Sequence, residues 1–490
     1  MRLTKSLCPE CYAVIDASII HENGRIMLEK TCKEHGFFKE VYWSNADQFK
    51  RFERYWHDGE GIENPNVSNG NCPNACGICP SHKTTTILAN IDVTNRCNQR
   101  CPVCFANASA SGYIYEPSLE QIRNMMQILR NEKPIPCPSV QFAGGEPTMR
   151  KDIVDIIRMA KEFNFTQIQI ATNGIKLAKS IGLCQELKKA GLNTVYLQFD
   201  GVTQQPYLIN RGYNALPFKL KAIENCRISG LSSVCLVPTL AKGVNDNEVG
   251  DIIRFAADNM DTIKGVNFQP VSFAGRIHRE ERMEKRITIP HLLELIEEQT
   301  NGDITSEDFY PVPFVTPISH FATAQEGVQN VEFTVHPHCG AGTYIYVEDG
   351  KMIPITRFID VEGLLEHIDE LASNDNKWKS LARIKRLSSL IKALPKYIDT
   401  KKAPKSVDVK KLFINVFKDG TGEATKEFHR HTLFIGAMHF MDAYNIDLER
   451  VQRCGIHYVT PDGRIIPFCT YNIIHRAEIE HKFSKPLIRA

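Results

Sequence analysis

Short apolar runs alternate with segments of helical periodicity from about residue 85 to residue 275. After residue 245, for example, apolar side chains at positions 249, 252, 253 and 256 follow the i, i+3, i+4, i+7 spacing of one helix face. Short connections between strands and helices predict parallel strands with right-handed crossovers. The segment is therefore predicted to be α/β, either a partial (β/α)6 TIM-like barrel or an open doubly wound sheet, with ligands at the carboxyl ends of the strands. The predicted strands are 87–93, 139–143, 167–171, 194–199, 233–238 and 264–269.

This alternation fades after about residue 290. Helical periodicity is predicted at 291–299, 361–373 and 377–394, with β-like pieces between them. Two segments, 339–350 and 454–469, share a Cys-Gly start, a β run, an Asp-Gly hairpin turn and a second β run. The polar stretch 401–409 is the best linker candidate.

The composition is that of an ordinary soluble globular protein, with 42% hydrophobic and 24% charged residues. A formal net charge of +2 provides no long-range electrostatic attraction to nucleic acid, so a nucleic-acid-binding protein is disfavoured. The first residues lack the apolar core of a secretory signal, and no apolar stretch approaches the roughly 18 to 20 residues of a membrane-spanning helix. Sixteen cysteines in such a chain predict a reducing cytoplasm, with metal or redox chemistry rather than disulfides.

Three cysteines, Cys97, Cys101 and Cys104, follow the first predicted strand with C-x3-C-x2-C spacing. They supply one thiolate fewer than a closed four-iron cluster needs, so one iron stays open to an external ligand. The arrangement resembles the radical S-adenosylmethionine (SAM) superfamily, in which the amino acid end of SAM chelates the open iron. The resemblance implies that these cysteines are catalytic, because the reduced cluster cleaves SAM to a 5′-deoxyadenosyl radical that abstracts hydrogen from an unreactive C–H bond. A structural zinc site is the alternative.

Polar residues at later strand ends fit the same resemblance. Gly144 and Gly145 would let a ligand approach the backbone closely, and Glu146 can accept a hydrogen bond from the SAM ammonium group. Together they match the Gly-Gly-Glu motif of the superfamily. The strand ends that follow would line the cofactor and substrate cavity, with polar strand-to-helix caps as the alternative. The residues implied there are Asn173, Asp200, Thr239 and Asn245.

A separate metal module is predicted at the N-terminus. A hairpin through Asn23 and Gly24 joins a C-x2-C pair to a second knuckle, a pattern that resembles a zinc ribbon or rubredoxin. Its soft donors accept either one zinc or one iron. A hairpin without metal is the alternative, and a thioredoxin-like role is disfavoured because no βαβ pattern follows. The predicted ligands are Cys8, Cys11, Cys32 and His35.

Two further cysteine groups are predicted to hold auxiliary iron–sulfur clusters. The first repeats the C-x3-C-x2-C spacing and by spacing alone could be the radical site, but no strand leads into it and no Gly-Gly-Glu follows at barrel spacing. The second resembles the auxiliary-cluster C-terminal domains of the superfamily. His82 and His338 are candidates for fourth ligands. The two groups are Cys72, Cys76 and Cys79, and Cys339, Cys454 and Cys469.

The layout as a whole resembles the archaeal tetraether lipid synthases. That resemblance implies SAM, three [4Fe–4S] clusters and one mononuclear iron or zinc. It implies an enzyme that couples terminal methyl carbons of archaeol-type isoprenoid chains into tetraether lipids. The expected partners are an isoprenoid glycerol-ether lipid and an external low-potential electron donor, with a cytoplasmic location and peripheral contact at the inner face of the membrane.

Radical SAM methyltransferases that act on the methanopterin precursor 7,8-dihydro-6-hydroxymethylpterin are a second resemblance and the alternative. A lipid substrate predicts a long apolar groove, for which 432–441 is apolar enough, although that run also suits a core strand. A pterin predicts a compact pocket with Asn, Asp or Arg groups facing the rings.

The predicted domains are a rubredoxin- or zinc-ribbon-like module at 1–60, an auxiliary-cluster segment at 61–84, a radical SAM core at 85–290 and a SPASM-like auxiliary-cluster and substrate domain at 291–490.

Overall fold

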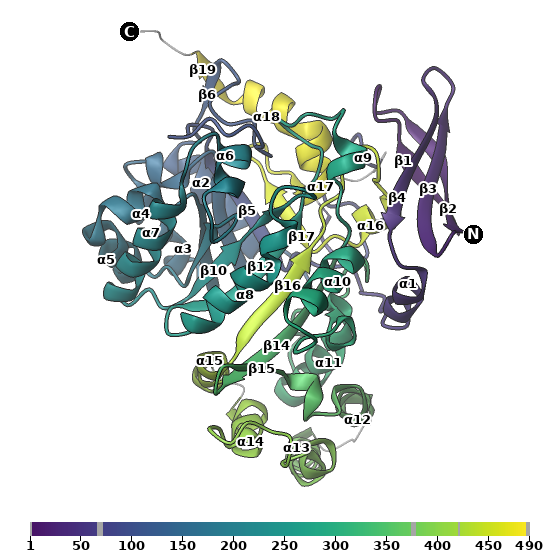
Figure 1. The fold of residues 1–490 in the computed structure, drawn as a ribbon, viewed down its shortest axis with the longest axis vertical. Coiled ribbons are helices and arrows are strands. Elements are labelled where there is room, and N and C mark those ends of the chain that lie inside the picture. The colour runs from purple at the N-terminus through teal and green to yellow at the C-terminus, as the bar shows by residue number, and fades with distance from the viewer. Residues whose placement is uncertain (1, 66–71, 374–378, 420–421, 487–490) are drawn as a thin grey trace.

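Six parallel strands, in the order in which they occur along the chain, form the centre of the fold (Figure 1). The computed structural model describes residues 2–65, 72–373, 379–419 and 422–486. Each of the six strands pairs in parallel with the next. A doubly wound sheet would reverse this order partway across, so the winding is that of a barrel. The strands are β5 (Leu88–Thr94), β7 (Ser139–Gly144), β8 (Gln167–Thr172), β9 (Thr194–Gln198), β10 (Val234–Val237) and β12 (Ile263–Pro270), each within one residue of its predicted bounds.

Helices connect these strands and pack on the sheet with their apolar faces (Figure 1). The first of them begins after Ser118, whose side chain accepts a hydrogen bond from the main chain of Gln121 in a capping box. The helices are α2 (Leu119–Arg130), α3 (Ile153–Glu162), α4 (Ile175–Lys179), α5 (Ile181–Ala190), α6 (Gln205–Arg211), α7 (Leu216–Ile228) and α8 (Val249–Asp258). Short elements between them are η1 (Pro147–Met149), β11 (Thr239–Leu240) and η2 (Asp246–Glu248).

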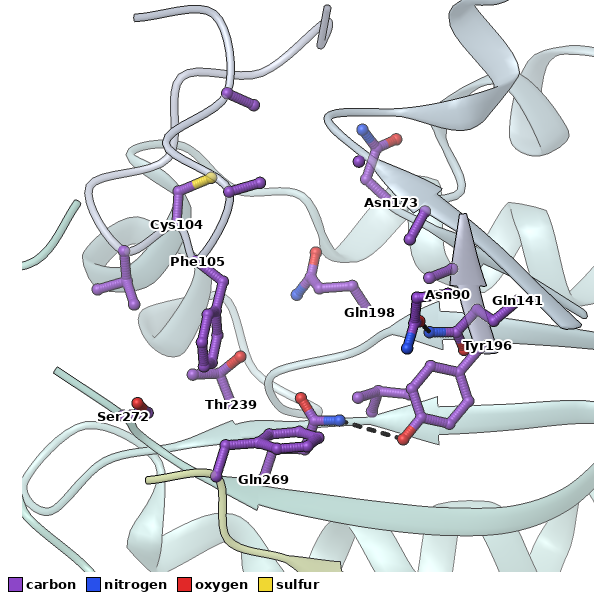
Figure 2. Close-up of a pocket in the computed structure, with 18 of the residues that line it drawn as sticks. Asn90, Cys104, Phe105, Gln141, Asn173, Tyr196, Gln198, Thr239, Gln269 and Ser272 are labelled. Atoms are coloured by element: carbon purple, nitrogen blue, oxygen red, sulfur yellow. Dashed lines mark hydrogen bonds between the residues drawn. The ribbon is translucent and has the colours of Figure 1, made fainter. Parts of the chain in front are cut away.

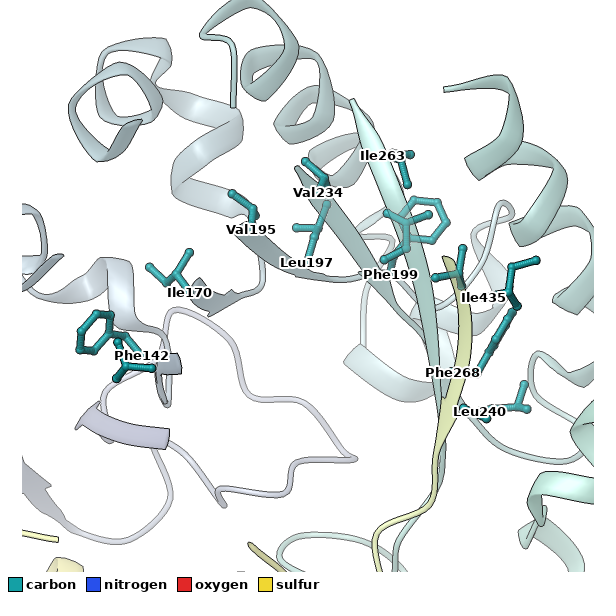
Figure 3. Packing of buried hydrophobic residues seen from close by; sticks show 14 of the residues in the cluster. Phe142, Ile170, Val195, Leu197, Phe199, Val234, Leu240, Ile263, Phe268 and Ile435 are labelled. Carbon is teal, nitrogen blue, oxygen red and sulfur yellow. The ribbon is translucent and has the colours of Figure 1, made fainter. Parts of the chain in front are cut away.

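The two faces of the sheet differ in character, because successive side chains of a strand point to opposite sides. On the inner face, Gln141 and Tyr196 border a cavity that we call the central cavity (Figure 2). On the outer face, Phe142, Val195 and Phe268 are fully buried in the main apolar cluster (Figure 3). The outer face therefore supplies the core, and the inner face supplies a site.

Two strands from the C-terminal part of the chain extend the parallel sheet at both edges, which the sequence pattern did not predict. β16 (Leu433–Met438) pairs in parallel with β12, and β17 (Ile456–Val459) pairs in parallel with β5. Both predicted C-terminal hairpins are confirmed, and the apolar run at 432–441 contributes a buried strand. Among the described strands, the sheet ends at β13 and β18, which do not pair, so it stays open. The antiparallel strands at its edges are β13 (Tyr310–Pro311), β14 (Gly340–Glu348), β15 (Lys351–Pro354) and β18 (Ile465–Pro467).

The N-terminal residues form a separate four-stranded antiparallel sheet, at the right of Figure 1. Asn23 and Gly24 both have positive φ, which a tight two-residue hairpin turn requires, so the predicted hairpin is confirmed. The sheet is anchored to the rest of the chain, since Lys30 donates to the main-chain oxygen of Ala443 at 2.7 Å. Its elements are β1 (Arg2–Leu7), β2 (Val14–Glu22), β3 (Arg25–Cys32) and β4 (Gly36–Trp43), followed by α1 (Ala46–Glu53).

The other helices lie mostly in the C-terminal part, where several enclose a second apolar cluster (Figure 1). Within the described ranges, no helix is long and apolar enough to cross a membrane. The α-helices are α9 (Arg282–Lys285), α10 (Ile289–Gln299), α11 (Thr316–Glu326), α12 (Val361–Ser373), α13 (Lys379–Tyr397), α14 (Val409–Asp419), α15 (Gly422–His431), α16 (Leu448–Gln452), α17 (Phe468–Thr470) and α18 (Arg476–Lys482). The short elements are η3 (Ser306–Asp308), η4 (Val312–Val315), η5 (Ile355–Arg357), the π-helix η6 (Tyr471–His475), and the paired strands β6 (Tyr113–Tyr115) and β19 (Ser484–Pro486).

Candidate active site and metal centres

The principal cysteine triplet lies on the loop that leaves β5 and faces the central cavity, whose volume is about 370 Å³. Cys97, Cys101 and Cys104 all line this cavity, so the structure brings the three predicted thiolates together. Burial raises the pKa of Cys97 to about 12 and also raises the pKa of Cys101. Buried thiolates therefore need a nearby positive charge, which coordinated iron supplies. The donor set fits a four-iron cluster with one open iron.

The segment after β12 holds this cysteine loop in place, which the sequence analysis did not predict. Cys104 and Arg276 exchange two main-chain hydrogen bonds, at 2.9 and 3.0 Å. The Arg276 guanidinium also donates to the main-chain oxygen of Cys101 at 2.8 Å. Gly275 has a φ of +71°, and a Cβ there would lie 2.3 Å from the main-chain oxygen of Phe105. The sequence signal for this contact is a glycine just beyond a strand end.

Gly144 and Gly145 place the end of β7 against the start of the cysteine loop, and both line the central cavity. A Cβ on Gly144 would lie 2.2 Å from the main-chain oxygen of Thr94. A Cβ on Gly145 would lie 2.4 Å from that of Arg96. The main-chain N–H of Gly145 donates to the Thr94 oxygen at 2.7 Å. Glycine is required at both positions by this contact between backbones, before any ligand is considered.

Glu146 lies behind the cavity wall, with only 1% of its surface exposed. One carboxylate oxygen accepts from the hydroxyl of Thr172 at 2.8 Å, and the other accepts from the main-chain N–H of Asn173 at 2.8 Å. The first oxygen also accepts from the main-chain N–H of Thr148 at 3.1 Å. Glu146 thus fixes the end of β8, from which Asn173 faces the cavity. Its contact with the SAM ammonium group stays a prediction.

Asp200 and Asn245 are fully buried and do not line the central cavity. Asp200 forms an ion pair with Arg211, at 2.6 Å. Asn245 donates to the main-chain oxygens of Asp200 at 2.8 Å and Thr239 at 2.9 Å. Asp200 and Asn245 therefore hold the strand ends in position, which agrees with the alternative prediction that they are polar strand-to-helix caps. Thr239 and Arg211, which they position, do line the cavity.

Carboxamide side chains cover the inner face of the sheet and were not predicted as site residues from the sequence. Gln169 donates to Gln141 at 2.7 Å, and Gln141 donates to Asn90 at 2.6 Å. Farther along the sheet, Gln269 donates to the hydroxyl of Tyr196 at 3.1 Å (Figure 2). The sequence does carry a signal for them. These strands have a polar residue at every second position, whereas parallel strands that are buried on both faces carry nearly continuous apolar runs. The carboxamides on the inner face are Asn90, Gln141, Gln169, Gln198, Asn267 and Gln269.

Aromatic rings form another wall of the central cavity. Phe440 and Phe468 are stacked, with centroids 3.8 Å apart, and Phe105 meets Phe468 edge-on at 5.6 Å. In Figure 2, Phe105 lies across the cavity from Gln141. No carboxylate lines the cavity within the described ranges. The cavity thus combines stacking surfaces with neutral hydrogen-bonding groups, a combination suited to a planar polar ligand.

The N-terminal module brings its four predicted ligands together. The sulfur atoms of Cys8, Cys11 and Cys32 and a ring nitrogen of His35 all lie within 4.8 Å of one another. Nδ1 of His35 is 3.7 Å from the sulfur of Cys8 and 3.5 Å from that of Cys32. Tetrahedral ligands placed about 2.0–2.3 Å from one ion are separated by distances of this size. The donor set fits one zinc or iron ion.

The other two cysteine groups each line a cavity of their own. The upstream group shares its cavity with His82, but His338 lies elsewhere, stacked on Phe49 with ring centroids 3.9 Å apart. Of the two histidines considered as fourth ligands, only His82 lines a cavity together with a cysteine group, because His338, although it precedes Cys339 in the chain, does not line the C-terminal cavity. Cys72, Cys76 and Cys79 line the upstream cavity, and Cys339, Cys454 and Cys469 line a cavity of about 230 Å³.

Comparison with known proteins assigns the family. Residues 91–256 match the model of the radical SAM superfamily, and residues 1–44 match that of the HMPTM N-terminal zinc ribbon domain. A 7,8-dihydro-6-hydroxymethylpterin dimethyltransferase of Methanocaldococcus jannaschii is 55% identical over 99% of this chain and 96% of its own. A GTP 3′,8-cyclase of Clostridium acetobutylicum is 27% identical over 47% of this chain and 73% of its own. The crystal structure of Streptococcus suis SuiB has a TM-score of 0.36 and 16% identity, and the match covers 45% of this chain and 47% of that chain.

The predicted function as a tetraether lipid synthase is wrong, because a relative that is 55% identical over 99% of this chain is a 7,8-dihydro-6-hydroxymethylpterin dimethyltransferase. The prediction rested on the layout of the cysteine groups, and such groups specify metals rather than a substrate. The apolar run expected to line a lipid groove forms β16 within the sheet. The chain belongs to the radical SAM family that includes the 7,8-dihydro-6-hydroxymethylpterin dimethyltransferase of M. jannaschii.

Proposed function

We propose that the chain is a radical SAM methyltransferase that acts on 7,8-dihydro-6-hydroxymethylpterin, the compound in the name of its M. jannaschii relative. The observation that carries this proposal is the central cavity, in which carboxamides face an aromatic wall. A pterin is planar and bears N–H donors, ring nitrogens and a carbonyl group around its edge. It can therefore stack on aromatic rings while amides hydrogen-bond to that edge.

Hydrogen bonds among the carboxamides leave defined groups for a ligand. The hydroxyl oxygen of Tyr196 accepts from both Asn267 and Gln269, so its own proton is available to a ligand acceptor. The side-chain oxygens of Gln169 and Gln269 accept no hydrogen bond from the described residues. These oxygens suit the N–H groups of a pterin. No carboxylate lines the cavity among the described residues, and the carboxamides on the inner face of the sheet are uncharged, which suits the neutral ring edge of a pterin.

When bound, the cluster and SAM would supply the radical that abstracts hydrogen from an unactivated carbon. The residues of the chain would position the reactants around that step. The loop of Cys97 and Cys104 forms one wall, the carboxamides hold the substrate on the inner face of the sheet, and Phe105 and Phe440 exclude water. An external low-potential electron donor stays a prediction, and so does membrane contact, which was expected only for a lipid substrate.

The proposal is tested with anaerobically reconstituted full-length protein, SAM, a strong reductant and 7,8-dihydro-6-hydroxymethylpterin. We expect 5′-deoxyadenosine to form faster when the pterin is present, and mass spectrometry to detect a pterin with one or two added methyl groups. GTP serves as the competing substrate, because the more distant relatives are GTP cyclases. Deoxyadenosine formation that responds to GTP and not to the pterin would exclude the proposal.

A further inference from the structure

The cavity of the C-terminal cysteines lies where the start of β14 meets the hairpin of β17 and β18. Cys339 directly precedes β14, Cys454 lies in the short connection between α16 and β17, and Cys469 lies in α17. All three line one cavity of about 230 Å³. Much of the remaining lining is apolar, with Val312, Phe333 and Val335 among its members. Three thiols that line one largely apolar cavity form a donor set suited to a soft metal centre.

His439 lines the same cavity and has no hydrogen-bond partner for its ring. It directly follows β16, is 2% exposed, and neither ring nitrogen is hydrogen-bonded to any described residue. Its main-chain N–H donates to the oxygen of Cys339 at 3.0 Å, which ties the histidine to a cysteine of the set. Leaving a buried polar group without a partner is unfavourable, so such groups are rare and point to a missing ligand.

Arg450 gives an independent indication that the occupant is anionic. It is 2% exposed, lines the cavity, and donates to the main-chain oxygen of His439 at 3.0 Å. Within the described ranges no carboxylate forms an ion pair with it, and the thiols of Cys339 and Cys469 are among its electrostatic partners. Because a buried guanidinium requires compensating negative charge, thiolates fixed on a metal centre would supply it.

The size of the site distinguishes a cluster from a single ion. The ribbon ligands all lie within 4.8 Å of one another, and they are the only group of this kind in the part of the chain that the structure describes. The donors around the C-terminal cavity are spread more widely, which suits several irons bridged by sulfide. We propose that Cys339, Cys454, Cys469 and His439 together hold an iron–sulfur cluster, with the imidazole of His439 as the fourth ligand. This proposal is independent of the substrate.

The test uses the anaerobically reconstituted full chain without SAM, in a Cys76→Ala background so that the upstream group contributes no spectrum. Pulsed EPR of the reduced protein is expected to show the nitrogen hyperfine coupling of a coordinated imidazole. His439→Cys should abolish that coupling while the iron content is retained, since a thiolate replaces the imidazole. His439→Ala should abolish it and also lower the iron content. His338→Gln is the matched control for removing a buried histidine and should leave the coupling intact.

Two results would overturn the proposal. The first is a nitrogen coupling that persists unchanged in His439→Cys. The second is an iron content unaffected by replacing Cys339, Cys454 and Cys469 together with serine, where a loss of about four irons per chain is expected. Retention of the EPR signal of the cluster on Cys97, Cys101 and Cys104 in each variant shows that the sheet shared by both sites has folded, since β17 pairs with β5, so a misfolded variant cannot be mistaken for either result.

Discussion

The ring of His82 donates a hydrogen bond from Nε2 to the main-chain oxygen of Cys454, at 2.8 Å. His82 lines the cavity of the upstream cysteines, whereas Cys454 lines the cavity of the C-terminal cysteines. A carbonyl oxygen only accepts, so Nε2 carries the proton and Nδ1 keeps a lone pair. Metal-ligating histidines commonly show this arrangement, in which the second ring nitrogen is fixed by a backbone carbonyl. The contact also joins two candidate metal centres directly.

His82→Ala is therefore expected to lower the iron bound by the upstream cysteines, while His82→Cys should retain it. The change should also shift the reduction potential of the C-terminal centre, because the hydrogen bond to Cys454 is lost. Iron analysis and a redox titration followed by EPR measure the two effects. His21→Ala, at an exposed position in β2, is the control. Full iron content and an unchanged titration in His82→Ala would contradict the assignment.

Tyr196→Phe tests the carboxamide site. Without the hydroxyl, the amides of Asn267 and Gln269 lose their common acceptor, which costs about 1–3 kcal/mol. We expect kcat/KM for the pterin to fall by roughly 10- to 100-fold, with SAM binding unchanged. Steady-state kinetics with the pterin and a SAM titration separate the two. Tyr113→Phe, outside the central cavity, should behave as wild type. An equal loss of SAM affinity would show a general defect instead.

The strands from β5 to β12 could be predicted because each is a short run with apolar residues on one face, and each pairs with strands that are close to it in sequence. The parallel pairing of β17 with β5 could not, since it joins His457 to Ala89 and no local pattern records a contact at that separation. The metal sites were visible because cysteine spacing is itself local. The substrate could not be predicted in this way, because the side chains proposed to bind it are amides such as Gln141 and Gln269, which come from different strands.

Gly145→Ala tests the backbone contact between β7 and the cysteine loop. A Cβ at this position would lie 2.4 Å from the main-chain oxygen of Arg96, so the loop must move. Overpacking of this kind costs about 1–3 kcal/mol, and we expect weaker SAM binding and less iron on the principal triplet. Isothermal titration and iron analysis measure these effects. Gly182→Ala is the control, because the nearest atom to its Cβ is the Ser180 hydroxyl at 3.7 Å, and it should change neither quantity.

Glu132 makes the stability of the fold depend on pH. It is 5% exposed, accepts a hydrogen bond from Thr86 at 2.7 Å, and its second oxygen has no partner among the described residues. Burial raises the pKa of this carboxyl from 4.5 to about 8. Between pH 4.5 and about pH 8, the folded chain therefore keeps a proton on Glu132 that the unfolded chain has released. Stability should fall as the pH rises through this window, by up to about 1.4 kcal/mol per pH unit from this group.

Glu132→Gln removes the titrating proton and can keep the acceptor for Thr86, so it should flatten this dependence. Near pH 5 the variant and the wild type should have similar melting temperatures, because the carboxyl is then largely protonated in the folded chain. Near pH 8 the variant should melt several degrees higher. At that pH the folded wild type either keeps a proton that the unfolded chain has released or buries an ionised carboxylate, and both lower its free energy of unfolding. Anaerobic thermal scans at one heating rate, from pH 5 to pH 8, measure the difference. Glu120→Gln, at an exposed position in the first turn of α2, should leave the profile of the wild type unchanged. A variant whose advantage over the wild type is the same at pH 5 and pH 8 would show that Glu132 affects packing and not proton linkage.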